Sequence, residues 1–133
     1  MKKILISILL FTLSSSVFAE ERVIGVALER YSVIAGGWWL NQKCKLLSQD
    51  KTGQFTSDVA VINTSLATTI NNPNLVMSIQ ASGKKTSESE PYASCAKVSD
   101  EIVNYSSSAA SQWANEIRKT VLDAATRLPG APK

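Results

Sequence analysis

Apolar residues recur at three- and four-residue spacing along most of the chain, which is the period of an α-helix. The stretch from Arg22 to Ser48 shows this spacing most densely, because two apolar lines run side by side in it. The first line is Ile24, Leu28, Tyr31, Ala35 and Trp38, and the second is Val26, Val33, Gly37, Leu40, Cys44 and Leu47. Together they make a face wider than a surface helix needs. We therefore predict a central helix that other helices enclose, with a narrow polar strip made of Glu29, Arg30, Asn41, Gln42 and Lys45.

Gly36 and Gly37 stand in the middle of this predicted helix. Each glycine costs about 1 kcal/mol relative to alanine in a helix interior, so the pair needs a reason. One interpretation is that another helix crosses closely there, with Trp38 and Trp39 beside the contact. A kink or a break is a second interpretation, and a ligand cleft with the glycines as floor and the indoles as walls is a third. We favour local packing, because apolar helical positions usually belong to a core.

The middle of the chain predicts two further helices. Residues 48–53 have the composition of a turn, and a helix over about 54–71 follows from the stripe Phe55, Val59, Ile62, Leu66 and Ile70. Asn72 and Pro73 suit the cap and the first position of a short helix, and Gly83 suits its end. Residues 83–91 contain no apolar side chain and are predicted to form a mobile polar connection.

The C-terminal part continues the pattern at coiled-coil spacing. From Pro91 the predicted buried line is Tyr92, Cys95, Val98, Ile102 and Tyr105, and a last helix over about 109–128 carries Ala110, Ala114, Ile117, Val121, Ala124 and Leu128. The opposite face of that helix is charged, with Glu116, Lys119, Asp123 and Arg127. The serines at 106–108 leave open whether these are two helices or one. The expected fold is all-α: one domain of residues 20–128, a bundle of four to five helices, with a tail at 129–133.

The first nineteen residues have the features of a secretory signal peptide. A basic start (Met1-Lys2-Lys3) precedes an apolar run, and Val17-Phe18-Ala19 offers small residues at a cleavage site, so the mature chain would begin at Glu20. The apolar run is too short for an anchor, and no other long one follows. Loss of Lys2 and Lys3 lowers the formal net charge from +3 to +1. We therefore expect a periplasmic or secreted protein with no transmembrane segment in its mature chain and no nucleic-acid partner.

The two cysteines, Cys44 and Cys95, predict one disulfide in an exported chain, because secreted domains use cysteine pairs as cross-links. The bridge would tie the first helix to the fourth. In the chain-entropy model, closing a loop of this length contributes about 4 kcal/mol to stability.

The absence of histidine limits the chemistry that the chain can perform. It removes the commonest general base, the commonest zinc ligand and every Ser-His or Cys-His pair. The acidic pairs Glu88/Glu90 and Asp100/Glu101 read as solvated surface, because nothing near them raises a carboxyl pKa as glycoside cleavage requires. We therefore expect a protein that is not an enzyme, with no cofactor and no metal site.

The overall plan resembles that of periplasmic immunity proteins and of secretin pilotins, which are small, exported, helical and clasped by one bridge. The resemblance is one of architecture and assigns no site residue. We expect a binding protein with a protein partner in the cell envelope. The candidate contact residues are Trp38, Trp39, Lys84, Lys85, Glu88 and Glu90. The alternative is a carrier that holds an apolar small molecule between its helices.

Overall fold

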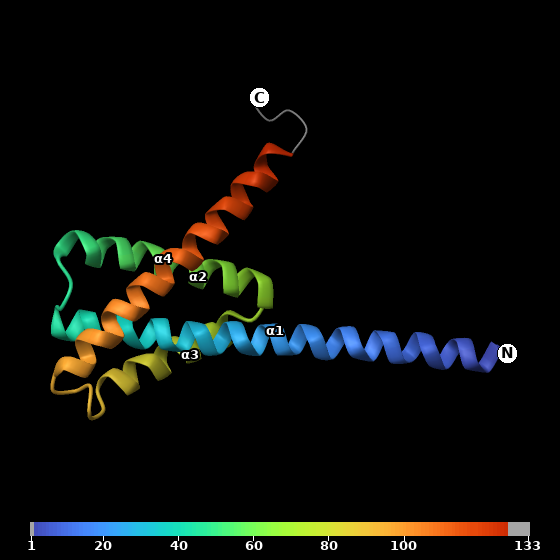
Figure 1. Cartoon of the computed structure of the whole chain (residues 1–133), viewed down its shortest axis with the longest axis horizontal. Helices are drawn as coiled ribbons and strands as arrows, with labels where there is room; N and C mark the ends of the chain where they lie inside the picture. Colours follow the sequence, from blue (N-terminus) through green and yellow to red (C-terminus); the bar gives the residue numbers. More distant parts are fainter. Residues whose placement is uncertain (1, 128–133) are drawn as a thin grey trace. The chain divides into compact units, whose positions relative to one another are not determined.

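The structure is a computed structural model that describes the backbone of residues 2–127 and the side chains of residues 21–127. It contains the helices α1 (Lys2–Cys44), α2 (Gln49–Ile70), α3 (Pro73–Ser87) and α4 (Lys97–Thr126) (Figure 1). No strand occurs among residues 2–127, so the predicted all-α fold is confirmed. The predicted tail at 129–133 lies outside the described residues, as do the side chains of the predicted signal peptide.

The chain divides into two compact units, Met1–Arg30 and Tyr31–Lys133. The described part of the first unit is helical from Lys2 onward. The second unit holds residues 31–44 of α1, about four turns, together with α2, α3 and α4, and it contains the core.

The core lies where α2 meets the other helices. The predicted stripe on α2 is confirmed, since Phe55, Val59, Ile62 and Leu66 are buried and Ile70 is half-buried. From α1 come Tyr31, Ile34, Ala35 and Leu40, from α3 Val76, and from α4 Val103, Ala110 and Ala114. The side chains from α3 and α4 are small, so these two helices bring their backbones close to their neighbours.

The glycine pair of α1 marks two such close approaches, which confirms the helix-crossing interpretation. A Cβ atom on Gly37 would overlap the side chain of Ser106 in α4. A Cβ atom on Gly83 of α3 would lie 2.8 Å from the Gly36 nitrogen and 3.0 Å from the Ala35 carbonyl carbon, which is too close. Helices α3 and α4 therefore each touch α1 at bare backbone, one at Gly36 and the other at Gly37.

Two predicted boundaries are wrong because capping and packing residues were read as turn residues. Residues 48–53 form no turn: α2 begins at Gln49, five residues earlier than predicted, because the Ser48 side chain accepts a hydrogen bond from the Lys51 nitrogen. Gly83 does not end α3, which continues to Ser87. The polar segment predicted at 83–91 is therefore helical in its first half. The Asn72 cap and Pro73 in the first turn are confirmed, with the Asn72 side chain accepting from the Leu75 nitrogen at 3.2 Å.

The two predicted C-terminal segments form one helix, α4, which answers the question that the sequence left open. It begins at Lys97 rather than near Pro91, and it runs without a break through residues 106–108 to Thr126. Ser106 does not cap a new helix: it is buried and donates a hydrogen bond to the Val33 carbonyl of α1 at 3.2 Å. Tyr105, predicted to be buried, is 64% exposed.

Asn41 belongs to the core and not to the polar strip in which the sequence placed it. It is 1% exposed, its amide donates to Thr52 Oγ1 at 2.9 Å, and its side-chain oxygen accepts from the Leu47 nitrogen at 2.9 Å. Both hydrogen bonds compensate the cost of burying the amide. Asn41 thereby fixes the connection between α1 and α2.

Candidate binding sites

The predicted disulfide between Cys44 and Cys95 is present, with a Cα–Cα distance of 5.7 Å, in the usual range for such bonds. It joins the last residue of α1 to the turn that precedes α4. Cys95 is exposed and Cys44 is half-buried, so the expectation that both face the core is wrong. The reason is that α4 starts two residues after Cys95, which therefore lies outside its helical repeat.

The structure brings together three of the six predicted contact residues. Trp38 and Trp39 are both half-buried, and their rings meet edge to face with centroids 4.7 Å apart. The Lys84 ammonium lies 5.4 Å from the centre of the Trp39 ring, in the range of a cation–π contact. The Trp38 indole nitrogen donates to Thr56 Oγ1 at 3.0 Å. Lys85, Glu88 and Glu90 are exposed around the end of α3.

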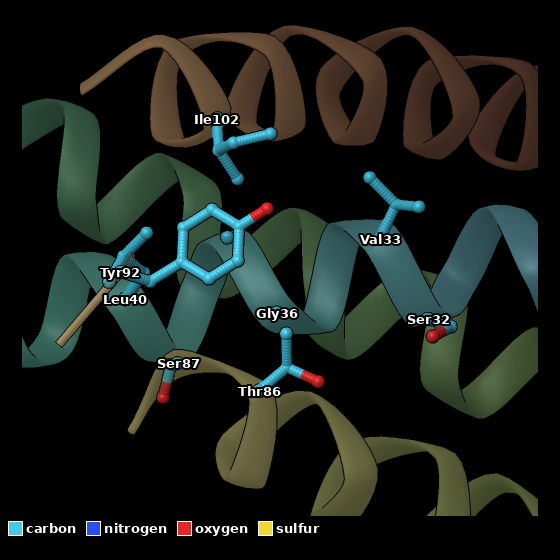
Figure 2. Close-up of a pocket in the computed structure, with 9 residues that line it drawn as sticks. Ser32, Val33, Gly36, Leu40, Thr86, Ser87, Tyr92 and Ile102 are labelled. Atoms are coloured by element: carbon cyan, nitrogen blue, oxygen red, sulfur yellow. The ribbon is translucent and has the colours of Figure 1, made fainter. Parts of the chain in front are cut away.

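A partly enclosed cavity of about 190 Å³ lies beside the glycine pair (Figure 2). Its lining is Ser32, Val33, Gly36, Gly37 and Leu40 from α1, Thr86 and Ser87 from α3, Tyr92 from the following turn, and Ile102 from α4. Figure 2 shows the Tyr92 ring between α1 and α4, with Ile102 directed toward it from α4. The sequence analysis considered a cleft with the glycines as floor and the indoles as walls. Gly36 and Gly37 do line this cavity, but neither Trp38 nor Trp39 does.

A second and larger hollow, of about 820 Å³, is an open groove between α2 and the second half of α4. Apolar side chains form much of it, namely Ala60 and Val61 from α2 with Ile117, Val121, Leu122 and Ala125 from α4, while Ser57, Thr64, Ser65, Thr68 and Thr69 supply hydroxyl groups and Arg118 lies at one end. Figure 1 shows α4 crossing α2 obliquely, so the two helices diverge toward the end of α4. The groove occupies this divergence.

A partly buried ion pair joins α2 and α4 beside the groove. Arg118 Nη2 of α4 lies 2.9 Å from Asp58 Oδ1 of α2, and the Asp58 side chain is 1% exposed whereas that of Arg118 is 38% exposed. Gln54 also donates to Asp58 Oδ1 at 2.9 Å, and Arg118 contacts Ser57 and Asn115. Arg118 is thus already engaged, and the groove presents no free charge from it. Periodicity alone could not reveal this pair, because Asp58 stands next to the apolar stripe and reads as a solvated residue.

The acidic side chains considered in the sequence analysis lie at the surface, since Glu88 and Glu90 are exposed. No group of three or more Cys, Asp or Glu side chains within residues 21–127 could hold a metal ion. Asp100 and Glu101 are both exposed on the first turns of α4. Among the described residues, no helix has the length and apolar content needed to cross a membrane.

The sequence could have indicated the groove but not the cavity. The apolar repeat on α4 continues past residue 114, and no other segment of the sequence is predicted to pack against its last positions. The cavity gathers residues from α1, α3, α4 and a turn, and no motif joins them. We found no family model, no curated protein and no solved structure that this chain matches.

Proposed function

We propose that this protein is an exported, non-catalytic binding protein whose partner is a protein of the cell envelope. The signal-peptide features of residues 1–19 and the Cys44–Cys95 bridge support export, because such bridges persist in oxidising compartments. The partner's contact would be an amphipathic helix lying in the groove between α2 and α4, a common mode of peptide recognition.

The observation that carries this proposal is the loss of cover along α4. Ile117 is half-buried, but Val121 and Leu122, one turn later, are 63% and 65% exposed. Neighbouring apolar side chains that line a groove between two helices are what an incoming helix needs, and monomeric proteins seldom leave such a surface uncovered. The carrier alternative is less well supported, because the groove is open and the cavity of about 190 Å³ is smaller than the usual site for a large apolar ligand.

The test is a capture experiment with matched surface variants. Val121→Asp/Leu122→Asp places two charges in the groove, whereas Met77→Asp places one on α3 at a side chain that is also 64% exposed but lies outside the groove. A partner retained from an envelope extract of the native host should be lost with the groove variant and kept with Met77→Asp. Equal retention by both variants would overturn the groove as the contact.

Three further measurements complete the test. Trp39→Ala, used in the same capture experiment, tests the predicted contact surface of Trp39 and Lys84. If this variant loses the partner while its unfolding temperature is unchanged, the partner binds at that surface and not in the groove. Sedimentation of the wild-type protein shows whether the occupant is a second copy. N-terminal sequencing of the mature protein should begin at Glu20, and a start at Met1 would contradict export.

A further inference from the structure

Gly36 lies at the crossing of α1 and α3, but a side chain at Gly36 itself, unlike one at Gly37 or Gly83, would not collide with the facing helix. Gly37 and Gly83 are required because a side chain at either would collide with the facing helix. A Cβ atom on Gly36 would meet nothing nearer than the Gly83 oxygen at 4.0 Å. Alanine would fit there and is the better helix former. Gly36 also lines the cavity, and the absence of a side chain there leaves that part of the cavity open.

The size and lining of that cavity specify the kind of molecule that would fill it. Its volume of about 190 Å³ is close to that of an apolar protein cavity, about 150 Å³, known to hold benzene. Val33, Leu40, Ile102 and the Tyr92 ring provide apolar contacts. No Asp, Glu, Lys or Arg side chain is among its lining residues. A charged ligand would therefore lose its hydration without gaining a partner.

Two of the four hydroxyl groups that line the cavity are already used. Thr86 donates to the Ser82 carbonyl at 3.1 Å and Ser87 to the Lys84 carbonyl at 2.6 Å, both within α3. The hydroxyls of Ser32 and Tyr92 make no hydrogen bond to any described residue. In Figure 2 the Tyr92 hydroxyl is directed along the cavity between α1 and α4. A single polar substituent on a ligand would find its partner there.

The wall that carries Tyr92 is held in place before any ligand arrives. The turn between α3 and α4 is fixed to the end of α1 by the Cys44–Cys95 bridge and by Lys43 Nζ, which donates to the Ala93 carbonyl at 2.9 Å. Ser99 of α4 donates to the Tyr92 carbonyl at 3.3 Å. A preformed wall lowers the entropic cost of binding.

We propose that this cavity binds an uncharged molecule the size of one six-membered ring that carries a single hydrogen-bonding substituent. The ring lies over Gly36 between Val33, Leu40 and Ile102, and the substituent pairs with the Tyr92 hydroxyl. This site is separate from the groove between α2 and α4, so it holds whether or not a protein partner binds there.

The probe is phenol, titrated into the oxidised protein and followed by NMR. A ligand of this size is expected to bind at about millimolar concentration, with the Ile102 methyl signals shifting in a saturable manner. Benzoate, which adds a charge, should not produce the shift. Absence of saturation with phenol, or equal binding of benzoate, would overturn the proposal.

Two variants locate the site. Gly36→Ala adds one methyl group to the cavity and should weaken phenol binding at least fivefold, whereas Gly53→Ala makes the same change in α2, where nothing lies within 4 Å, and should leave binding unchanged. Tyr92→Phe removes the free hydroxyl and should reduce the affinity for phenol to that for benzene. Unchanged affinity in Gly36→Ala, or an unaltered preference for phenol in Tyr92→Phe, would place the bound molecule elsewhere.

Discussion

The two halves of α4 carry one continuous apolar repeat, but only the first half is covered by other helices. Ser99, Val103, Ser106, Ala110 and Ala114 are buried at spacings of three and four residues. The same spacing continues through Ile117 and Val121, yet every residue from Lys119 to Arg127 is exposed. Periodicity thus identifies which face of a helix is apolar. Whether that face has a partner depends on where the neighbouring helix diverges.

The side chains of the two halves differ in a way that explains their surroundings. In the first half the buried residues are mostly serine and alanine, which let α4 approach α1 until Ser106 touches Gly37. In the second half the same face carries the larger Ile117, Val121 and Leu122. Small residues permit a close crossing, and the larger ones beyond it line a groove. Four changes should break or sharpen this contrast.

The largest effect is expected at the close crossing itself. Gly37→Ala should destabilise the protein by about 3 kcal/mol, because its methyl group overlaps Ser106 and both helices are packed on their other sides. Chemical denaturation measures the loss. Gly36→Ala, which has no such overlap, serves as the control, and Ser106→Gly introduced with Gly37→Ala should recover much of the stability. Equal stability of the two single variants would mean that α1 and α4 are not in close contact.

Alkaline pH should lower the free energy of unfolding through Tyr31, a core residue of α1. This side chain is fully buried, and its hydroxyl donates a hydrogen bond to Asn63 at 3.0 Å. Burial raises the pKa of Tyr31 to about 12, and a hydrogen bond with Gln80 lowers that pKa in part. Because the folded pKa exceeds the unfolded value of 10.0, the stabilisation is complete below pH 10 and is lost as pH rises toward 12. The loss should reach about 2 kcal/mol near pH 12. Unfolding curves of Tyr31→Phe should lack this component, and identical pH profiles would contradict the assignment.

The ion pair of Asp58 and Arg118 joins α2 to α4 near the point where the covered half of α4 ends. Arg118→Ala should lower the free energy of unfolding by about 2 kcal/mol, because it leaves the buried Asp58 carboxylate without its cation. The loss is smaller than for a fully buried pair because the arginine is partly exposed. Lys119→Ala, a neighbouring exposed residue, should change stability by less than about 0.5 kcal/mol. Thermal unfolding of both variants measures this difference in stability. A similar effect of the two would show that the pair does not join α2 to α4.

The smallest effect is expected in the open half. Leu122→Ser should alter the free energy of unfolding by less than about 0.5 kcal/mol, because the side chain is already 65% exposed. Ala114→Ser, on the same helix but fully buried, provides the contrast and should be clearly destabilising. A large loss from Leu122→Ser would mean that the second half is covered within the isolated protein.

Much of this fold follows from the sequence because apolar spacing and cysteine usage are local and compositional signals. The α2 stripe, the Asn72 cap and the Cys44–Cys95 pairing were all predictable in this way. Gly83 was misread, because a glycine can end a helix or admit a neighbouring helix. Ser106 left the continuity of α4 undecided, because a serine can cap a helix or fill a narrow crossing. Only the facing helix decides between these roles. The cavity beyond Gly36 was anticipated as one of three interpretations, but its Tyr92 wall depends on a turn whose position no periodicity encodes.

The placement of the disulfide bears on how accessible the bond is to reagents in the solvent. Cys95 is exposed on a turn outside the helical core, and the buried residues of α1, α2 and α4 do not include either cysteine. The bond therefore lies outside the buried core. Because Cys95 is exposed, a thiol reagent in the solvent can reach this bond in the folded protein without opening the packing between the helices.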